Sequence, residues 1–213
     1  MALRDEQDNA NDLAQHGFRH PVSVPLSDRL SPNNPFAFPA GCCFAVDVMD
    51  IETTRLILHA IDEAEARRIC ARALGPNDSW AADYPFAGDL AGVGSFLRAT
   101  EQHGEQRPFG YYQIIRAADR LAVGGVGFKG PPRGGSVEVG YGLALSARGH
   151  GYAGEALTAL LTVAANHGVA TVLADTTHEN VASQRTLVNA GFTLVSADAD
   201  LQYYEIWPAQ PSM

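Results

Sequence analysis

Hydrophobic residues change their spacing along the chain, and each change marks the border of an element. The apolar run within residues 54–58 predicts a strand. Asp62, followed by Glu63 and Glu65, predicts a capped helix start, because acidic side chains favour the positive end of a helix dipole. Residues 89–100 place apolar side chains at helical spacing, so a second helix is predicted there although glycines interrupt it.

The middle of the chain changes from helical spacing to strand-like composition. Residues 109–116 and 121–128 are rich in aromatic and branched side chains, and only four residues separate them. This pattern predicts two antiparallel strands joined by a hairpin. The glycine and proline cluster at 129–135 predicts a break before a third strand at 137–145.

The last third of the chain alternates between helices and strands. The predicted elements are a helix at about 153–167, a strand at 170–174, a helix at 181–190 and strands at 192–195 and 203–207. The element order therefore predicts a mixed α/β fold, with hairpins first and a βαβ-like unit later.

Prolines divide the chain into two parts. Five of the 12 prolines fall within residues 1–48, among polar residues that show no sustained hydrophobic period. We expect residues 1–48 to form a poorly ordered N-terminal extension and residues 49–213 to form one catalytic domain. A chain of 213 residues with 46% hydrophobic content can build one such core.

Charge and cysteine content exclude several classes of protein. The formal net charge of -9 and the 15 scattered basic residues argue against nucleic-acid binding. The cysteines Cys42, Cys43 and Cys70 have no CxxC spacing, so neither a metal site nor a disulfide framework is predicted. No segment has the length and apolarity of a membrane span or a secretory signal. We therefore expect a cytoplasmic protein with reduced thiols.

The third predicted strand has one nearly bare face. Alternation places Gly140, Gly142 and Ala144 on that face, with Glu138 as its ionisable group. Small residues leave room for a ligand to lie against the strand. They also permit close packing on a helix with Glu138 in solvent, and the strand alone does not decide between these interpretations.

The turn after this strand is rich in glycine. Gly149, Gly151 and Gly154 allow close backbone approach at a helix start, where N–H groups and the helix dipole favour a pyrophosphate, and Arg148 adds a positive charge. The spacing also matches a dinucleotide fingerprint, with Asp175 following as its acidic residue. A Rossmann domain needs further parallel crossovers, for which the chain after Asp175 is short. A loop with incidental glycines is the remaining alternative.

A third motif distinguishes between these ligands. Asn180, Ser183 and Arg185 stand at the start of the later helix. Together with the turn at 148–156, this motif resembles the GNAT acetyltransferase superfamily, in the branch that includes ribosomal-protein N-terminal alanine and serine acetyltransferases. Three further segments resemble the same branch, and the likeness covers about residues 50–207: these segments are Thr54–Leu58, Gly127–Gly130 and Glu138–Tyr141.

The resemblance implies a fold and a cofactor. The fold would be a single GNAT-like domain, with a mostly antiparallel twisted sheet that splays at the cofactor cleft and about four flanking helices. The cofactor would be acetyl-CoA, with its pyrophosphate on the turn and its pantetheine arm in the splay, and no metal would be needed. The residues implied to bind it are Leu143, Leu145, Arg148, Gly149, His150, Gly151, Tyr152, Ala153, Gly154, Asn180, Ser183 and Arg185.

The implied reaction is attack of a primary amine on the thioester in a ternary complex. The amine would belong to a protein N-terminus or a small molecule, and Glu138 is the predicted base. Ser183 is the predicted proton donor to the leaving thiolate. Many relatives use a tyrosine of the last helix as the acid, and here no tyrosine lies between Ala153 and Gln202. The alternatives are a catalytically silent acyl-CoA sensor and an NAD-binding oxidoreductase, and a homodimer is the expected assembly.

Overall fold

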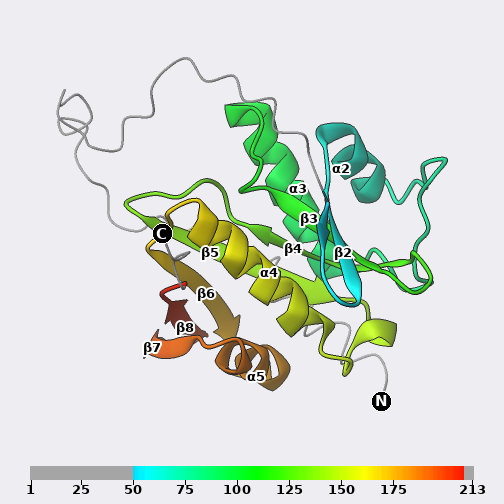
Figure 1. Cartoon of the computed structure of the whole chain (residues 1–213). Coiled ribbons are helices and arrows are strands. Elements are labelled where there is room, and N and C mark those ends of the chain that lie inside the picture. Colours follow the sequence, from blue (N-terminus) through cyan, green and yellow to red (C-terminus); the bar gives the residue numbers. More distant parts are fainter. Residues whose placement is uncertain (1–49, 209–213) are drawn as a thin grey trace, which may run out of the picture.

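The computed structural model describes residues 50–208, which contain eight strands and four α-helices (Figure 1). The predicted extension, residues 1–48, lies outside the described residues. The strands are β1 Ile51–Glu52, β2 Leu56–Ala60, β3 Tyr111–Arg116, β4 Ala122–Phe128, β5 Ser136–Leu143, β6 Thr171–Thr177, β7 Thr193–Ala197 and β8 Leu201–Ile206. The helices are α2 Glu63–Cys70, α3 Ala87–His103, α4 Tyr152–Asn166 and α5 Val181–Asn189.

All strands join one sheet in the order β1-β2-β3-β4-β5-β6-β8-β7. The ladders are antiparallel except between β5 and β6, which is the one parallel pair among these named strands. The predicted mixed α/β fold with a mostly antiparallel sheet is therefore confirmed. A Rossmann domain requires a parallel sheet, so this topology contradicts the NAD-binding alternative.

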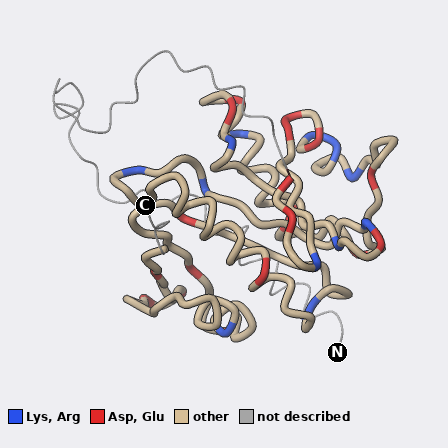
Figure 2. The backbone as a smooth tube through the Cα atoms, in the orientation of Figure 1, with Lys and Arg blue, Asp and Glu red and all other residues tan. Residues whose placement is uncertain are grey.

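Helices cover both faces of the sheet. Helix α3 packs on β3, β4 and β5 beside α2, whereas α4 packs on β2, β4 and β5 beside α5. Figure 1 shows α4 crossing in front of the sheet, with α2 and α3 together on the other side. The core on the α4 side includes side chains that are fully buried: Leu56, Leu58, Val126, Leu157 and Leu160. The charged residues lie scattered along the chain, and the basic ones form no continuous stripe in the part that Figure 2 describes.

The predicted start of α2 is confirmed in atomic detail. Asp62 is the N-cap, and its side chain accepts a bond from the Glu65 N–H at 2.8 Å. The Glu65 carboxylate in turn accepts from the Asp62 N–H at 2.8 Å. This reciprocal pair is a capping box, which satisfies backbone donors that the first helical turn leaves without partners.

Glycines on two elements make room for Tyr111. A Cβ atom on Gly92 of α3 would lie 2.9 Å from the Tyr111 ring, and one on Gly125 of β4 would lie 1.8 Å from its hydroxyl. The hydroxyl donates to Asp89 Oδ1 at 2.6 Å. Asp89 is only 1% exposed, and burial raises its pKa to about 6. Gly92, one of the glycines that interrupt the predicted helix, therefore lets α3 pack closely on the sheet.

The third predicted strand ends earlier than the sequence indicates. β5 stops at Leu143, and Leu145 begins a short 3-10 helix, Leu145–Ala147, where its side chain is 62% exposed. The prediction that Leu145 continues the strand is therefore wrong. The alternating pattern continues in sequence, but the backbone turns at Ala144, whose own side chain is buried.

β7 forms an exposed edge of the sheet. All five of its residues are exposed, including Leu194 and Val195, each with 48% of its surface accessible. An edge strand of this kind presents backbone groups that can pair with another chain. The expected homodimer stays a prediction.

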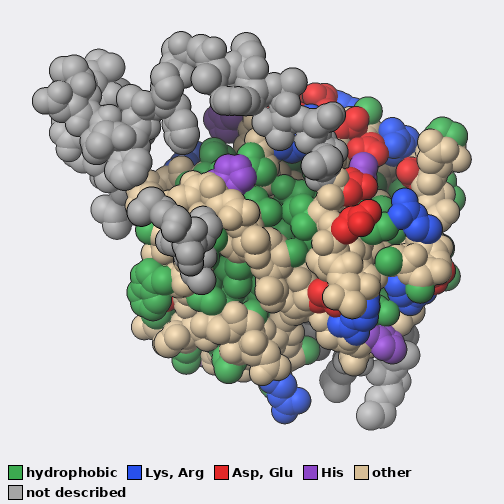
Figure 3. Space-filling view, viewed as in Figure 1, with side chains coloured by type: hydrophobic (Ala, Val, Ile, Leu, Met, Phe, Trp, Pro, Cys, Tyr) green, Lys and Arg blue, Asp and Glu red, His purple; other side chains and the backbone are tan. Residues whose placement is uncertain are grey.

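His59 links β2 to the segments on either side of it. Its Nδ1 lies 2.7 Å from Asp50 Oδ1 and its Nε2 lies 3.0 Å from Glu65 Oε1. Figure 3 shows acidic side chains gathered over this β2–α2 corner. The hydrogen bond to Glu65, together with the bond to Asp50, outweighs the opposite effect of partial burial and raises the pKa of His59 from 6.5 to about 9.

This raised pKa makes stability depend on pH. Because the folded state binds the proton more tightly, the stabilisation is full below the unfolded value of 6.5 and is lost as pH rises through about 9. His59→Gln should lower Tm by about 3–6 °C at pH 6, for a loss of about 1–2 kcal/mol, and by much less at pH 9.5. Thermal melts at both values test this, with His103→Gln as an exposed control. An equal loss at both values would contradict a charged His59.

Candidate active site

The glycine-rich turn leads from β5 into α4. Gly149 and Gly151 have φ values of +80° and +78°, a left-handed conformation that favours glycine. A Cβ atom on Gly149 or Gly154 would have no neighbour within 4 Å, so the outer surface of the turn is open. Gly151 is the N-cap of α4, and the first N–H groups of a helix have no acceptor within it. The turn therefore offers backbone donors to an anion.

Arg55 and Glu155 stabilise this turn through hydrogen bonds. Glu155 of α4 accepts from the Arg55 N–H at 2.8 Å, from Arg55 Nε at 2.7 Å and from the Thr53 hydroxyl at 2.6 Å. Arg55 also donates to the His150 carbonyl at 2.8 Å, and its guanidinium lies 5.0 Å from the centre of the Tyr152 ring. The start of β2 thus fixes the turn 100 residues later. Sequence reasoning missed this contact, although both residues fall within recognised motifs.

Arg148 joins the turn to the end of β5. Its Nε donates to the Leu143 carbonyl at 3.2 Å, while the residue itself is exposed. The turn therefore carries the charge of Arg148, whereas the charge of Arg55 is paired with Glu155. His150 is exposed and its ring stacks on Tyr152, with 5.5 Å between the ring centres.

β5 and β6 separate after a short ladder. Only Ser136, Val137 and Glu138 pair with β6, whereas the remainder of β5 continues along β4 alone. The bonds from Lys129 N–H to Glu138 O and from Ala144 N–H to Val123 O show that even-numbered residues of β5 direct their backbone groups toward β4. Since these directions alternate, Val139, Tyr141 and Leu143 direct theirs toward the gap.

Tyr141 and Ser183 meet on the α4 and α5 side of this gap. The two hydroxyl oxygens lie 2.9 Å apart, and the Tyr141 hydroxyl also donates to the Ser183 carbonyl at 3.1 Å. The Ser183 N–H is capped by Asn180 Oδ1 at 3.1 Å. Arg185 is exposed on α5. Alternation placed Tyr141 on the core side of its strand, but no local signal indicated that Ser183 would be its partner.

Three charged side chains meet on the other side of the sheet. Lys129 Nζ donates to Glu138 Oε1 in a short bond and to Asp175 Oδ1 at 3.0 Å. Burial would lower the pKa of Lys129, but the attraction of Glu138 and Asp175 outweighs it and raises the pKa. For Glu138 burial dominates and raises the pKa, although Lys129 opposes this change. Lys129 is therefore held as a cation, and Glu138 takes up a proton more readily than an exposed glutamate.

A small cavity connects the two groups. Its volume is about 30 Å³, and it is lined by Lys129, Val139, Gly140, Tyr141, Ala174, Asp175 and Ser183. Lys129 and Asp175 belong to one face of the sheet, while Tyr141 and Ser183 interact on the other. The cavity therefore passes through the sheet where β5 and β6 separate.

The glycine face of β5 is less open than the sequence indicates. A Cβ atom on Gly142 would lie 2.8 Å from the ring of Phe86, which is the N-cap residue of α3. A Cβ atom on Gly140 would lie 3.7 Å from Lys129 Cε. At Gly142 the structure therefore supports the alternative of close packing on a helix, because an aromatic ring from the start of α3 fills the space.

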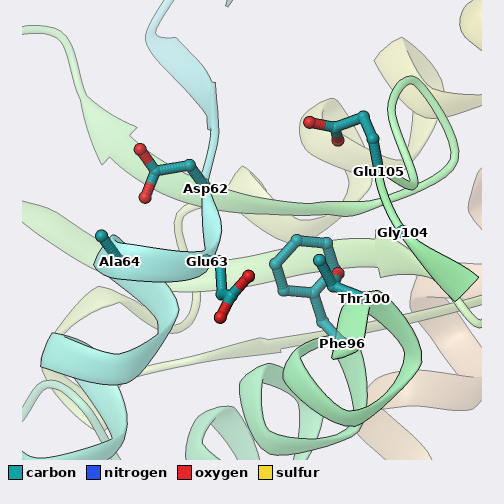
Figure 4. A pocket seen from close by; sticks show the side chains of 7 residues that line it. All are labelled: Asp62, Glu63, Ala64, Phe96, Thr100, Gly104 and Glu105. Carbon is teal, nitrogen blue, oxygen red and sulfur yellow. The ribbon is translucent and has the colours of Figure 1, made fainter. Parts of the chain in front are cut away.

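A larger hollow lies between α2 and α3 (Figure 4). Its volume is about 380 Å³, and Asp62, Glu63 and Glu105 stand around Phe96. Each carboxylate has a local partner: the α2 backbone for Asp62, Arg67 for Glu63 and Arg107 for Glu105. These local partners explain why acidic side chains surround the hollow, so no ligand is needed to explain them.

Residues 50–208 hold no group of three or more His, Cys, Asp or Glu side chains that could bind a metal ion. Within the same range, no helix is long and apolar enough to cross a membrane.

Comparison with known proteins decides the family. A family model described as an acetyltransferase (GNAT) domain matches residues 55–193, which is more than half of the chain. This protein is a member of the GNAT acetyltransferase family. The match includes the turn, both separating strands and the Tyr141–Ser183 pair, and it confirms the predicted resemblance.

Individual relatives of this GNAT protein are distant. It is 27% identical over 164 residues to the uncharacterised N-acetyltransferase YjdG of Bacillus subtilis, covering 72% of this chain and 95% of that protein. RimL, a ribosomal-protein α-N-acetyltransferase solved with coenzyme A, matches with 21% identity and a TM-score of 0.53 over 73% of this chain and 95% of RimL. A ribosomal-protein alanine acetyltransferase from Vibrio fischeri matches with 16% identity and a TM-score of 0.52 over 75% of this chain and 97% of its own. At these identities the structures show a shared fold.

The turn can be tested directly. Gly149→Val with Gly151→Val should lower acetyl-CoA affinity at least about 30-fold, because a branched side chain disfavours the left-handed backbone at a cost of roughly 1–3 kcal/mol per residue. Gly134→Val with Gly168→Val is a matched control, since these glycines have φ values of +59° and +71° and equally open surroundings. Calorimetric titration measures both variants. Retained affinity in a folded turn variant would contradict the phosphate assignment.

Proposed function

We propose that this GNAT protein transfers the acetyl group of acetyl-CoA to a primary amine by direct attack in a ternary complex. The observation that carries the proposal is the gap between β5 and β6. A carboxylate pair lies at one face of this gap, a pair of hydroxyl groups lies at the other, and the glycine-rich turn follows the same strand. The gap thus combines a base, a proton donor and a phosphate-binding turn.

The cofactor is proposed to follow this gap. Its pyrophosphate would bind the N–H groups of the turn from Gly149 to Gly154, beside Arg148. The pantetheine arm would take the place of a strand next to residues 139–143, whose backbone groups are directed toward it. Asn180 and Arg185 would border the arm from α5, and the exposed Leu145 would border it near the turn. The GNAT family match supports acetyl-CoA as the acyl donor.

Glu138 is proposed to act as the base. It removes one proton from the acceptor ammonium, and the nitrogen lone pair then attacks the thioester carbon, placing negative charge on the carbonyl oxygen. The backbone N–H of Leu143 stabilises that oxyanion. The tetrahedral carbon collapses, the C–S bond breaks, and the remaining extra proton of the nitrogen passes to water as the amide forms.

Ser183 and Tyr141 are proposed to act together on the leaving group. Ser183 donates a proton to the thiolate sulfur, Tyr141, hydrogen-bonded to it at 2.9 Å, replaces that proton, and water then reprotonates Tyr141. This arrangement supplies a tyrosine from β5 where many relatives use one from the last helix. Tyr203 and Tyr204 have other partners, Asp198 Oδ2 at 2.7 Å and Gln202 Oε1 at 2.6 Å.

The described cysteine favours direct transfer over an acyl-enzyme. Cys70 is exposed on α2, outside the cavity lining, and partial desolvation of its thiol, together with the nearby charge of Asp89, raises its pKa. A thiol with a raised pKa forms less of the thiolate needed for nucleophilic attack. The acceptor itself is proposed to be a protein N-terminus or a small-molecule amine, and two structural neighbours that are ribosomal-protein acetyltransferases support the first of these.

Release of free CoA tests the proposed transfer. Purified protein with acetyl-CoA should produce thiol steadily when given a reactive member of a panel of peptide amides, polyamines, aminoglycosides and amino acids. Mass spectrometry should find the acetylated amine in equal amount. Acetyl-CoA binding without thiol release from any amine would instead favour the catalytically silent sensor.

Substitutions at the two faces of the gap distinguish the proposed base, Glu138, from the proposed proton donors, Ser183 and Tyr141. Glu138→Gln should lower kcat about 100-fold and remove its decline toward acidic pH, because that decline reports protonation of the base. The decline should begin above the ordinary glutamate value of 4.5, since burial raises the pKa of Glu138. Tyr141→Phe should lower kcat about tenfold and leave the KM for acetyl-CoA unchanged.

Matched variants control for charge and for loss of a hydroxyl. Glu179→Gln removes an exposed carboxylate, and Tyr204→Phe removes a hydroxyl that lies outside the cavity. Both should keep wild-type kcat. An unchanged pH profile in Glu138→Gln would eliminate Glu138 as the base, and wild-type kcat in Tyr141→Phe would eliminate the proton relay.

A further inference from the structure

Asp175 has a position that its sequence spacing did not indicate. The dinucleotide fingerprint would place it against a ribose, at the end of a parallel strand. Instead it stands in the last part of β6, beyond the short ladder with β5, and its carboxylate lines the cavity through the sheet. The acetyl-transfer steps above assign it no role.

The contacts of Asp175 place it beside the proposed base. One lysine, Lys129, bonds both Asp175 and Glu138, so the two carboxylates lie on the same face of the sheet at the same opening. Gly140 lies next to the Lys129 side chain, because a Cβ atom on Gly140 would be 3.7 Å from Lys129 Cε. No larger side chain at residue 140 crowds the group.

The charges of this group do not cancel. One ammonium faces two carboxylates, so an excess negative charge remains at the opening of the gap. Opposite charges that are partly removed from water attract strongly, so the opening favours a second cation. A zwitterion gains much less there, because its own carboxylate is repelled.

Lys129 is not itself the amine that accepts the acetyl group. Its two carboxylate partners keep the ammonium protonated, as its raised pKa indicates. A protonated amine has no lone pair for attack on a thioester. The lysine is therefore suited to hold the carboxylates together, which leaves one of them to bind an incoming ammonium.

We propose that Asp175 is a specificity-determining residue that binds the acceptor's ammonium beside Glu138, and that it selects cationic amines without a carboxylate next to the amino group. This inference rests on the proposed acetyl transfer. It predicts that peptide N-termini and polyamines are acceptors and that free amino acids are not. After binding, one ammonium proton passes to Glu138, and Asp175 keeps its charge.

The test compares acceptors that differ in one group. Alaninamide and alanine share an amino group, but only alanine carries the neighbouring carboxylate. Thiol release is measured with this pair, with a peptide amide and with spermidine, in wild-type protein, Asp175→Asn and Asp200→Asn. Asp200 is exposed and lies outside the cavity lining, so its substitution removes an equal charge elsewhere.

Cationic acceptors should be used and alanine should not. Asp175→Asn should raise the KM of each cationic acceptor about tenfold, with kcat and the KM for acetyl-CoA within twofold of wild type, because recognition is lost while the base remains. Asp200→Asn should match wild type. Lys129→Gln, which removes the one positive charge of the group, should not raise the KM for spermidine.

Other results would overturn the inference. Preferential use of alanine, or an unchanged acceptor KM in Asp175→Asn, removes Asp175 from acceptor recognition while leaving acetyl transfer intact. A loss of kcat at constant KM would place Asp175 in the chemistry instead. If no amine releases thiol although acetyl-CoA binds, the transfer itself fails, and the acceptor assignment fails with it.

Discussion

The short ladder between β5 and β6 is the constraint on which the site depends. A sheet normally pairs every backbone donor and acceptor of an inner strand, because an unpaired polar group is costly to bury. Here pairing stops at Glu138, and the strands diverge in the middle of an eight-stranded sheet. The divergence leaves a small cavity between the two groups of side chains. In the proposed reaction, groups on opposite faces of the sheet act on one molecule lying in this gap.

The divergence also explains why the acidic and hydroxyl groups have such different surroundings. Lys129, Glu138 and Asp175 are polar and partly exposed, with side-chain exposures of 33%, 38% and 24%. Tyr141 and Ser183 lie between a strand and a helix, where the Tyr141 hydroxyl bonds the hydroxyl and the backbone carbonyl of Ser183. In the proposed reaction, the charged groups therefore lie where the amine arrives, and the hydroxyl groups lie where the thiolate leaves.

The amino-acid sequence predicts the local parts of this architecture well. Period changes locate nearly all elements, and the capping box at Asp62 and the left-handed glycines of the turn follow from residue chemistry. Leu145 shows the limit of periodicity, because the alternating pattern persists where the chain has already turned away from β4. The local pattern cannot show that the ring of Phe86 fills the space above Gly142, since the two residues belong to elements far apart in the sequence. The Tyr141–Ser183 and Lys129–Asp175 contacts also join elements that are far apart in the sequence. They depend on the register between strands, which the local pattern does not determine.

The bond between Arg55 and Glu155 sets where a self-sufficient acetyl-CoA-binding fragment has to begin. A fragment of the second half of the chain would carry the whole turn and α4, yet Glu155 would lose Arg55 and Thr53, and the His150 carbonyl would lose its donor. Thr53 also lies just ahead of the region that matches the family, which starts at residue 55. The hydrogen-bonded unit therefore begins before the region that matches the family. The Thr53 hydroxyl, outside that region, bonds the Glu155 carboxylate, which Arg55 inside the region also bonds.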